Sequence, residues 1–208
     1  TYGAVIVPIL PDFKPDDLVN LVNHSDSVIL FVDDKIIESL DESKLAAIKA
    51  FISVDALKMI SSTDILMRES YAGMAERFHI AWPDLKPGDI KFSDISNDKL
   101  AVISYTGGTT GFSKGVMISH NSLAANVRYA QNNMPLKSGD PLVSFLPLAH
   151  TYGCAFEFLF PFTIGCHITI LSKTPSPRII IKAFKEIKQI LKLSWPLVVE
   201  RGWKRWNV

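Results

Sequence analysis

The order of apolar and polar positions predicts short strands that alternate with helices along the chain. Continuous apolar runs at 4–10 and 27–33 are typical of buried strands, and the second predicts a parallel strand covered on both faces. Between these runs, Pro15 followed by Asp16 and Asp17 predicts the first turn of a helix. The apolar positions of this helix fall on one face: Leu18, Val19, Leu21 and Val22.

The rest of the chain continues this alternation. Strands predicted over 100–105 and 115–119 flank a loop of small residues, and a helix over 121–133 follows them. Further strands are predicted at 51–54, 141–146 and 166–171, and further helices at 42–50, 64–78, 150–163 and 177–188. Strands that alternate with helices predict an α/β fold with mostly parallel sheets flanked by helices.

The loop between the two central strands carries the most specific pattern in the sequence. Residues 105–115 read Tyr-Thr-Gly-Gly-Thr-Thr-Gly-Phe-Ser-Lys-Gly. Glycines let backbone N–H groups turn toward an anion, threonine hydroxyls add donors, and Lys114 adds a positive charge. The pattern is not a Walker A loop, because Ser113 precedes the lysine and Gly115 follows it. A plain hairpin turn is the alternative, but it needs only two to five residues, so we predict a polyphosphate-binding loop.

The loop resembles the phosphate-binding loop of the adenylate-forming superfamily: acyl-CoA synthetases, aryl-CoA ligases, luciferases and peptide-synthetase adenylation domains. Most members carry Ser where this chain has Gly107, and Pro where it has Ser113. A loop with Gly at this first position resembles that of bacterial long-chain fatty acyl-CoA synthetases. The Leu-Pro-Leu-Ala-His-Thr-Tyr segment at 146–152 resembles the family's second conserved segment. Residues 3–33 resemble its early strand–helix–strand passage, so the resemblance covers about residues 1–188.

The resemblance implies a two-step reaction on a fatty acid, ATP and coenzyme A. The carboxylate attacks the α-phosphorus of ATP to give an acyl-adenylate and pyrophosphate, and coenzyme A then displaces AMP. The residues implied around the β- and γ-phosphates are Thr106, Gly107, Gly108, Thr109, Thr110, Gly111 and Lys114. The resemblance also implies Thr109 as a ligand of Mg²⁺.

Two further residues are implied beside the acyl substrate. His150 is expected to orient the carboxylate or shield the adenylate, which makes it the second catalytic candidate after Lys114. Tyr152 is expected to border the acyl site. The alternatives are a hydrogen-bonded structural histidine at a helix start and a tyrosine that packs in the core.

Several segments of the resembled family are not found in the sequence. These are its adenine-binding segment, its Tyr-Gly-x-Thr-Glu segment and the catalytic lysine of its mobile C-terminal domain. The chain also begins in mid-strand without Met. We therefore expect a partial AMP-binding N-terminal domain over 1–188, without the C-terminal lid domain and inactive on its own. Another adenylate former, such as an aryl-CoA ligase or a peptide-synthetase domain, and a non-catalytic nucleotide-binding fragment stay open as alternatives.

Charge separates the end of the chain from the rest. The net charge of +1 gives no reason to expect nucleic acid as a partner. From Lys173 onward, however, there are nine Lys or Arg and two Asp or Glu, and three of the four tryptophans lie in 189–208. This atypical basic, Trp-rich tail leaves two hypotheses open. It is either an altered end of the sequence or an aromatic and basic contact surface, for example for peripheral contact with a membrane.

Composition gives two expectations about the protein's surroundings. Cys154 and Cys166 follow neither a metal-ligand nor a disulfide pattern, so we expect buried free thiols in a reducing cytoplasm. No run of about 18 apolar residues is present, so no transmembrane helix is expected.

Overall fold

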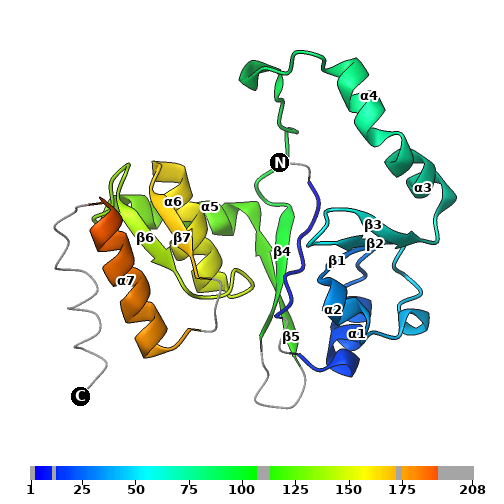
Figure 1. Cartoon of the computed structure of the whole chain (residues 1–208), viewed down its shortest axis with the longest axis horizontal. Coiled ribbons are helices and arrows are strands. Elements are labelled where there is room, and N and C mark those ends of the chain that lie inside the picture. The colour runs from blue at the N-terminus through cyan, green and yellow to red at the C-terminus, as the bar shows by residue number, and fades with distance from the viewer. Residues whose placement is uncertain (1–2, 11–12, 107–112, 172–174, 192–208) are drawn as a thin grey trace. The chain divides into compact units, whose positions relative to one another are not determined.

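The computed structural model describes residues 3–10, 13–106, 113–171 and 175–191. The chain divides into two compact units, Thr1–Asn121 and Ser122–Val208, called here the N-terminal and C-terminal units. Both units combine helices with small sheets (Figure 1), which confirms the predicted α/β class. The described strands pair in both directions: the three-stranded sheet is mixed, one two-stranded sheet is antiparallel and the other is parallel.

A three-stranded sheet organises the first part of the N-terminal unit. Its order is β1 (Ile29–Val32), β2 (Ala50–Ser53) and β3 (Met59–Ser62). β1 runs parallel to β2, with Ile29 opposite Ala50, and β3 returns antiparallel to β2. The prediction of a parallel strand near 27–33 is therefore confirmed, whereas β3 was not predicted.

Helix α1 (Pro15–His24) supplies the core of this part of the molecule. The four apolar positions predicted for its inner face are all buried: Leu18, Val19, Leu21 and Val22. Val19 and Val22 pack in one cluster with Leu45, Ile48 and Phe51, the last of which lies on β2. The helical spacing of the sequence thus identified the buried face correctly.

The expectation that both faces of β1 are covered is wrong for the residues described here. Leu30 packs against the core cluster and Val32 is buried, but Phe31 is 62% exposed and Ile29 is 38% exposed. Successive side chains of a strand point to opposite faces. β1 is therefore covered on one face only, and its uniformly apolar sequence concealed this alternation.

Short helices complete the N-terminal unit: α2 (Asp34–Ile37), η1 (Glu42–Lys44), α3 (Ile65–Ala72), α4 (Met74–Ala81) and η2 (Pro87–Asp89). The helix predicted over 42–50 is wrong, because only the single turn η1 forms before β2 begins at Ala50. The irregular helix predicted over 64–78 is present as α3 and α4, which meet at Gly73.

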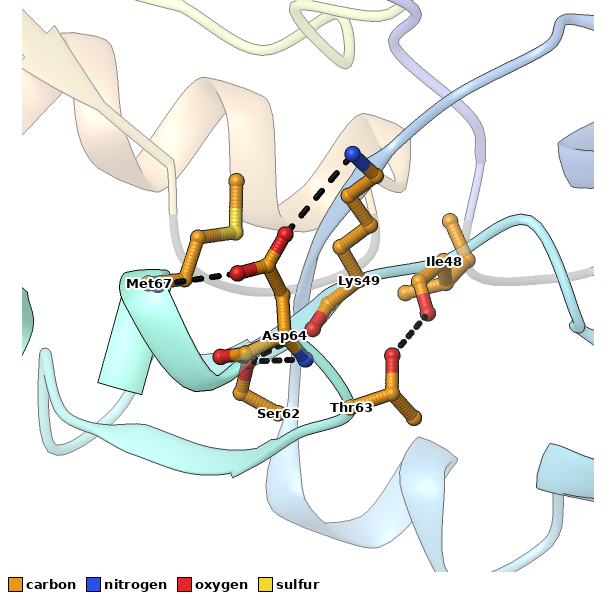
Figure 2. Close-up of polar contacts among 6 residues, drawn as sticks. All are labelled: Ile48, Lys49, Ser62, Thr63, Asp64 and Met67. Carbon is orange, nitrogen blue, oxygen red and sulfur yellow. Dashed lines mark hydrogen bonds and ion pairs between the residues drawn. The ribbon is translucent and has the colours of Figure 1, made fainter. Parts of the chain in front are cut away.

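Asp64 fixes the start of α3 against the sheet (Figure 2). Its carboxylate accepts a hydrogen bond from the Met67 backbone N–H at 3.1 Å, and its other oxygen lies 3.7 Å from the Lys49 ammonium. The Ser62 hydroxyl donates to the Lys49 carbonyl at 2.7 Å. An Asp at this position satisfies a helix N–H that has no partner inside the helix.

A second sheet pairs β4 (Leu100–Thr106) with β5 (Lys114–Ser119) in antiparallel register. The N-terminal segment runs beside β4 (Figure 1), where Ile6 forms a single parallel bridge with Val102. The buried strand predicted at 4–10 is wrong, because this segment forms only that bridge and Ile6 is 63% exposed. An apolar run becomes a buried strand only where other elements cover it.

The C-terminal unit contains a parallel pair of strands, β6 (Pro141–Ser144) and β7 (His167–Ile170). The helix predicted between them over 150–163 is present in a different form. A π-helix spans Gly153–Leu159 and continues into α6 (Phe160–Ile164). The remaining predicted helices are confirmed as α5 (His120–Asn133) and α7 (Pro177–Leu191).

The predictions about membranes and cysteines have these outcomes. Within the described ranges, no helix is both long enough and apolar enough to cross a bilayer. Cys154 and Cys166 are free, and each is partly buried. Burial raises the pKa of both thiols, and for Cys166 the charge of Asp140 adds to that effect. The tail predicted to be atypical lies outside the described residues from 192 onward.

Candidate functional site

The antiparallel pair β4–β5 defines the first part of the candidate site. Thr106 is the last residue of β4, Lys114 is the first residue of β5, and the two are register partners. Both side chains are exposed, so the hydroxyl and the ammonium stand at the same end of the paired strands. Within the described ranges, no carboxylate forms an ion pair with Lys114. A hydroxyl donor and a positive charge are thus both accessible to an anion at this end.

The remaining predicted phosphate ligands lie outside the described residues: Gly107, Gly108, Thr109, Thr110 and Gly111. The metal ligand predicted at Thr109 is among them. Elsewhere in the described part of the chain, no three His, Cys, Asp or Glu side chains gather in a way that could hold a metal ion. The described geometry therefore concerns the two strand ends that anchor the predicted loop.

Tyr105 anchors this end of β4 from inside the N-terminal unit. It is 8% exposed, and its hydroxyl lies 2.7 Å from Nδ1 of His24, at the end of α1. The two rings meet edge to face with their centres 5.7 Å apart. Burial, and secondarily the charge of Asp26, raises the pKa of Tyr105. The phenol therefore keeps its proton at neutral pH and can donate a hydrogen bond to Nδ1 of His24.

Gly115 makes room for this arrangement on the neighbouring strand. It is the register partner of Tyr105. A Cβ at residue 115 would lie 3.0 Å from the Ile103 side chain and 3.3 Å from the Tyr105 ring. The glycine next to the lysine thus allows β5 to pack closely against the Ile103 and Tyr105 side chains of β4.

His150 lies in a tight turn that follows β6 in the C-terminal unit. Its backbone N–H donates to the Pro147 carbonyl at 2.8 Å. Its Nδ1 accepts a hydrogen bond from the Tyr152 backbone N–H at 3.2 Å. A neutral imidazole that accepts at Nδ1 carries its proton on Nε2. The exposed His150 ring is therefore prepared to donate a hydrogen bond from Nε2.

Tyr152 stands next to this turn. It is 48% exposed, and its ring packs against Phe156 with the ring centres 4.8 Å apart. Tyr152 is therefore not a fully buried core residue. It offers an aromatic surface two residues from the imidazole of His150.

Glu157 supports the same turn and was not predicted. It is 7% exposed, and its Oε2 accepts hydrogen bonds from the N–H groups of Phe145 and Leu146, both at 2.9 Å. Gly153 lies so close to the turn that a Cβ there would be 2.8 Å from the Pro147 carbonyl oxygen. One signal was present in the sequence: Glu157 is the only charged residue in the apolar run 154–164.

The structure thus arranges the described candidates as two pairs, Thr106 with Lys114 in the N-terminal unit and His150 with Tyr152 in the C-terminal unit. Both pairs lie within residues 1–200, which match the family profile described as "AMP-binding enzyme". The chain belongs to the AMP-binding enzyme family. This finding confirms the resemblance carried by the loop at 105–115.

Two relatives of this AMP-binding chain are named as an acyl-CoA ligase and an acyl-CoA synthetase. It is 25% identical over 195 residues to the acyl-CoA ligase sidI of Aspergillus fumigatus, covering 89% of this chain and 32% of that protein. It is 30% identical over 161 residues to the peroxisomal long chain acyl-CoA synthetase 6 of Arabidopsis thaliana, covering 76% of this chain and 22% of the relative. The chain therefore spans about a third or less of the length of these relatives.

A solved structure with the same fold is ATP-bound MatB from Rhodopseudomonas palustris. The TM-score is 0.64 at 21% sequence identity, and the match covers 87% of this chain and 32% of MatB. At this identity the similarity shows a shared fold. The small sheets and helices of the AMP-binding chain are thus part of an architecture that is also found in MatB.

Proposed function

We propose that this chain contributes the phosphate-binding loop and part of the acyl site to an ATP-dependent fatty acid–CoA ligase. The observation that carries the proposal is the pairing of Thr106 with Lys114 at the anchored end of β4–β5. The names of the relatives favour an acyl group as the substrate, and the long chain synthetase favours a long one. The ATP in MatB supports ATP as the nucleotide.

Lys114 and the loop would act on the leaving group of the first step. When the carboxylate attacks the α-phosphorus, negative charge grows on the departing pyrophosphate. The Lys114 ammonium and the Thr106 hydroxyl would stabilise that charge together with donors of the loop, because positioning and electrostatic stabilisation supply most of the catalysis in phosphoryl-type chemistry. The register of β4 and β5 fixes the backbone of Thr106 and Lys114, so these two donors need little reorganisation.

His150 would act on the acyl side of the same reaction. With Nδ1 occupied by the Tyr152 N–H, its Nε2–H can donate to an oxygen of the carboxylate or of the acyl-adenylate. Such a bond orients the carboxylate for attack and does not require the imidazole to change its charge. Tyr152 would contribute apolar contact beside it.

Mg²⁺ and coenzyme A complete the proposed set of ligands. The exposed hydroxyl of Thr106 indicates the type of donor that this end of β4 offers, a hard oxygen suited to Mg²⁺. Thr109 is the proposed protein ligand, together with phosphate oxygens and water. When bound, Mg²⁺ neutralises phosphate charge. Coenzyme A is the proposed acceptor of the acyl group in the second step.

We also propose a cytoplasmic location, because Cys154 and Cys166 are free and free thiols persist in a reducing compartment. The partial N-terminal domain over 1–188 would depend on the rest of a longer ligase for activity.

The proposal can be tested by measuring which carboxylic acids support ATP–pyrophosphate exchange by the intact ligase. Palmitate should support exchange, whereas benzoate and free amino acids should give only the rate of an acid-free control. The 208-residue chain alone should give no exchange with any acid. Exchange with benzoate or an amino acid but not with palmitate would replace the fatty acid by one of the alternative substrate classes. If the intact ligase gives no exchange with any acid, a non-catalytic nucleotide-binding role is favoured instead.

A further inference from the structure

The π-helix at Gly153–Leu159 holds a buried carboxylate that the proposed reaction does not use. Glu157 is 7% exposed, and the neighbouring Ala155 and Phe160 are also buried. Burying an ionised carboxylate is costly unless hydrogen bonds compensate for the lost water. Single-turn π-helices are frequent at functional sites. The position of Glu157 therefore calls for an explanation beyond core packing.

The partners of Glu157 lie in the chain directly after β6. The strand ladder ends at Ser144, and the next two backbone N–H groups, of Phe145 and Leu146, both donate to Oε2 of Glu157 at 2.9 Å. One carboxylate oxygen thus satisfies both of the backbone donors that directly follow the strand. Hydrogen bonds to an ionised acceptor are about twice as strong as neutral ones.

The segment held in this way leads directly to His150. Leu146 is followed by Pro147, whose carbonyl accepts the His150 N–H at 2.8 Å, and the imidazole is in turn held by the Tyr152 N–H. Gly153, on the same π-helix as Glu157, packs against the Pro147 carbonyl so closely that no side chain fits between them. The turn is therefore held at its start by Glu157 and from its side by Gly153.

We propose that Glu157 is a positioning residue for His150. By fixing the start of the turn, it sets the orientation and the Nε2–H tautomer of the imidazole four residues further along. The catalytic consequence rests on the proposed function, because only a ligase would use His150 on a carboxylate. The geometric claim is independent of that function.

Two variants separate the reach of the side chain at residue 157 from its charge. Glu157→Asp keeps the charge but is one methylene shorter, so its oxygen cannot reach both N–H groups. Glu157→Gln keeps the length, and its amide oxygen can accept both bonds. Thr163→Val is the matched control, because Thr163 lies on α6 and its hydroxyl donates to Phe160 rather than to the turn.

The first readout is the imidazole ¹⁵N spectrum of the 208-residue chain, with His150 assigned by comparison with His150→Gln. Wild type, Glu157→Gln and Thr163→Val should show the Nε2–H tautomer at neutral pH, and Glu157→Asp should show the mixed tautomers of a freely rotating imidazole. A folded Glu157→Asp with the wild-type His150 signature would overturn the proposal. If Glu157→Asp does not fold, a folded Glu157→Gln that retains the signature supports the proposal, and one that loses it overturns it.

The second readout is kinetic and uses the intact ligase. Glu157→Asp should lower kcat for adenylation by about 100-fold, the cost of an ångström-scale misplacement, and leave the KM for ATP unchanged. An equal loss in Glu157→Gln, or a change confined to the KM for ATP, would contradict a positioning role. If the wild-type ligase shows no adenylation at all, the proposed function fails while the spectrum still tests Glu157.

Discussion

At the residue scale, the contact between His24 and Tyr105 links the end of α1 to the end of β4, where the proposed phosphate loop begins. The two residues are 81 positions apart, and the hydroxyl of Tyr105 lies 2.7 Å from Nδ1 of His24. Gly115 leaves room for the Tyr105 ring on the neighbouring strand. The tyrosine that opens the loop motif therefore has a structural role that is separate from the binding of phosphate.

Removing the Tyr105 hydroxyl should weaken the fold by the value of one hydrogen bond. Tyr105→Phe should lower the free energy of unfolding by about 0.5–1.5 kcal/mol at pH 8, measured by urea denaturation. In a double-mutant cycle with His24→Ala, most of this loss should appear as coupling between the two residues. Tyr129→Phe is the control, because Tyr129 is 63% exposed. Zero coupling between residues 24 and 105 would contradict the assigned contact.

The same contact predicts a dependence on pH. Burial raises the pKa of Tyr105 above its ordinary value of about 10, so the folded chain holds the phenolic proton more tightly than the unfolded chain. The stabilisation by Tyr105 is therefore complete below pH 10 and is lost as the pH rises through the folded pKa. The difference in unfolding free energy between wild type and Tyr105→Phe should shrink above pH 10, and a constant difference would refute this.

At the scale of elements, sequence periodicity predicted the elements whose pattern is set locally. The inner face of α1 was identified correctly, and the helices α5 and α7 lie where the sequence predicted them. The failures concern apolar segments whose environment is set by distant parts of the chain. Residues 42–50 have helical spacing but form only one turn before they join β2, because Ala50 pairs with both β1 and β3.

The contribution of the core cluster around α1 to stability can be tested by substitution. Ile48 is 2% exposed and packs with Val19, Val22, Leu45 and Phe51. Ile48→Ala should lower the free energy of unfolding by about 2–5 kcal/mol, because it removes apolar contacts and leaves a cavity. Ile65→Ala is the matched control, since Ile65 is 65% exposed and should change stability by less than about 0.5 kcal/mol. Equal losses in the two variants would contradict the assigned core.

At the scale of the whole molecule, the sequence predicted the α/β class and the family, and the loop motif made that possible. The roles of the site residues stay predictions. The structure adds that Thr106 and Lys114, the two ends of the predicted loop, are register partners, because β4 and β5 pair in antiparallel register. The supports of the site could not be predicted, because His24 and Glu157 act through contacts with segments that their own local sequence does not specify.

The central claim is that Lys114 at the start of β5 stabilises charge on the phosphates of ATP. The most direct test is fatty-acid-dependent ATP–pyrophosphate exchange by the intact ligase carrying Lys114→Ala, with Lys91→Ala, another exposed lysine of the N-terminal unit, as the control. We predict that Lys114→Ala lowers kcat/KM by about 10²–10³-fold, as for the loss of one preorganised donor, and that Lys91→Ala leaves it unchanged. An unchanged kcat/KM in Lys114→Ala would remove this lysine, and the proposed role of the hairpin, from the reaction.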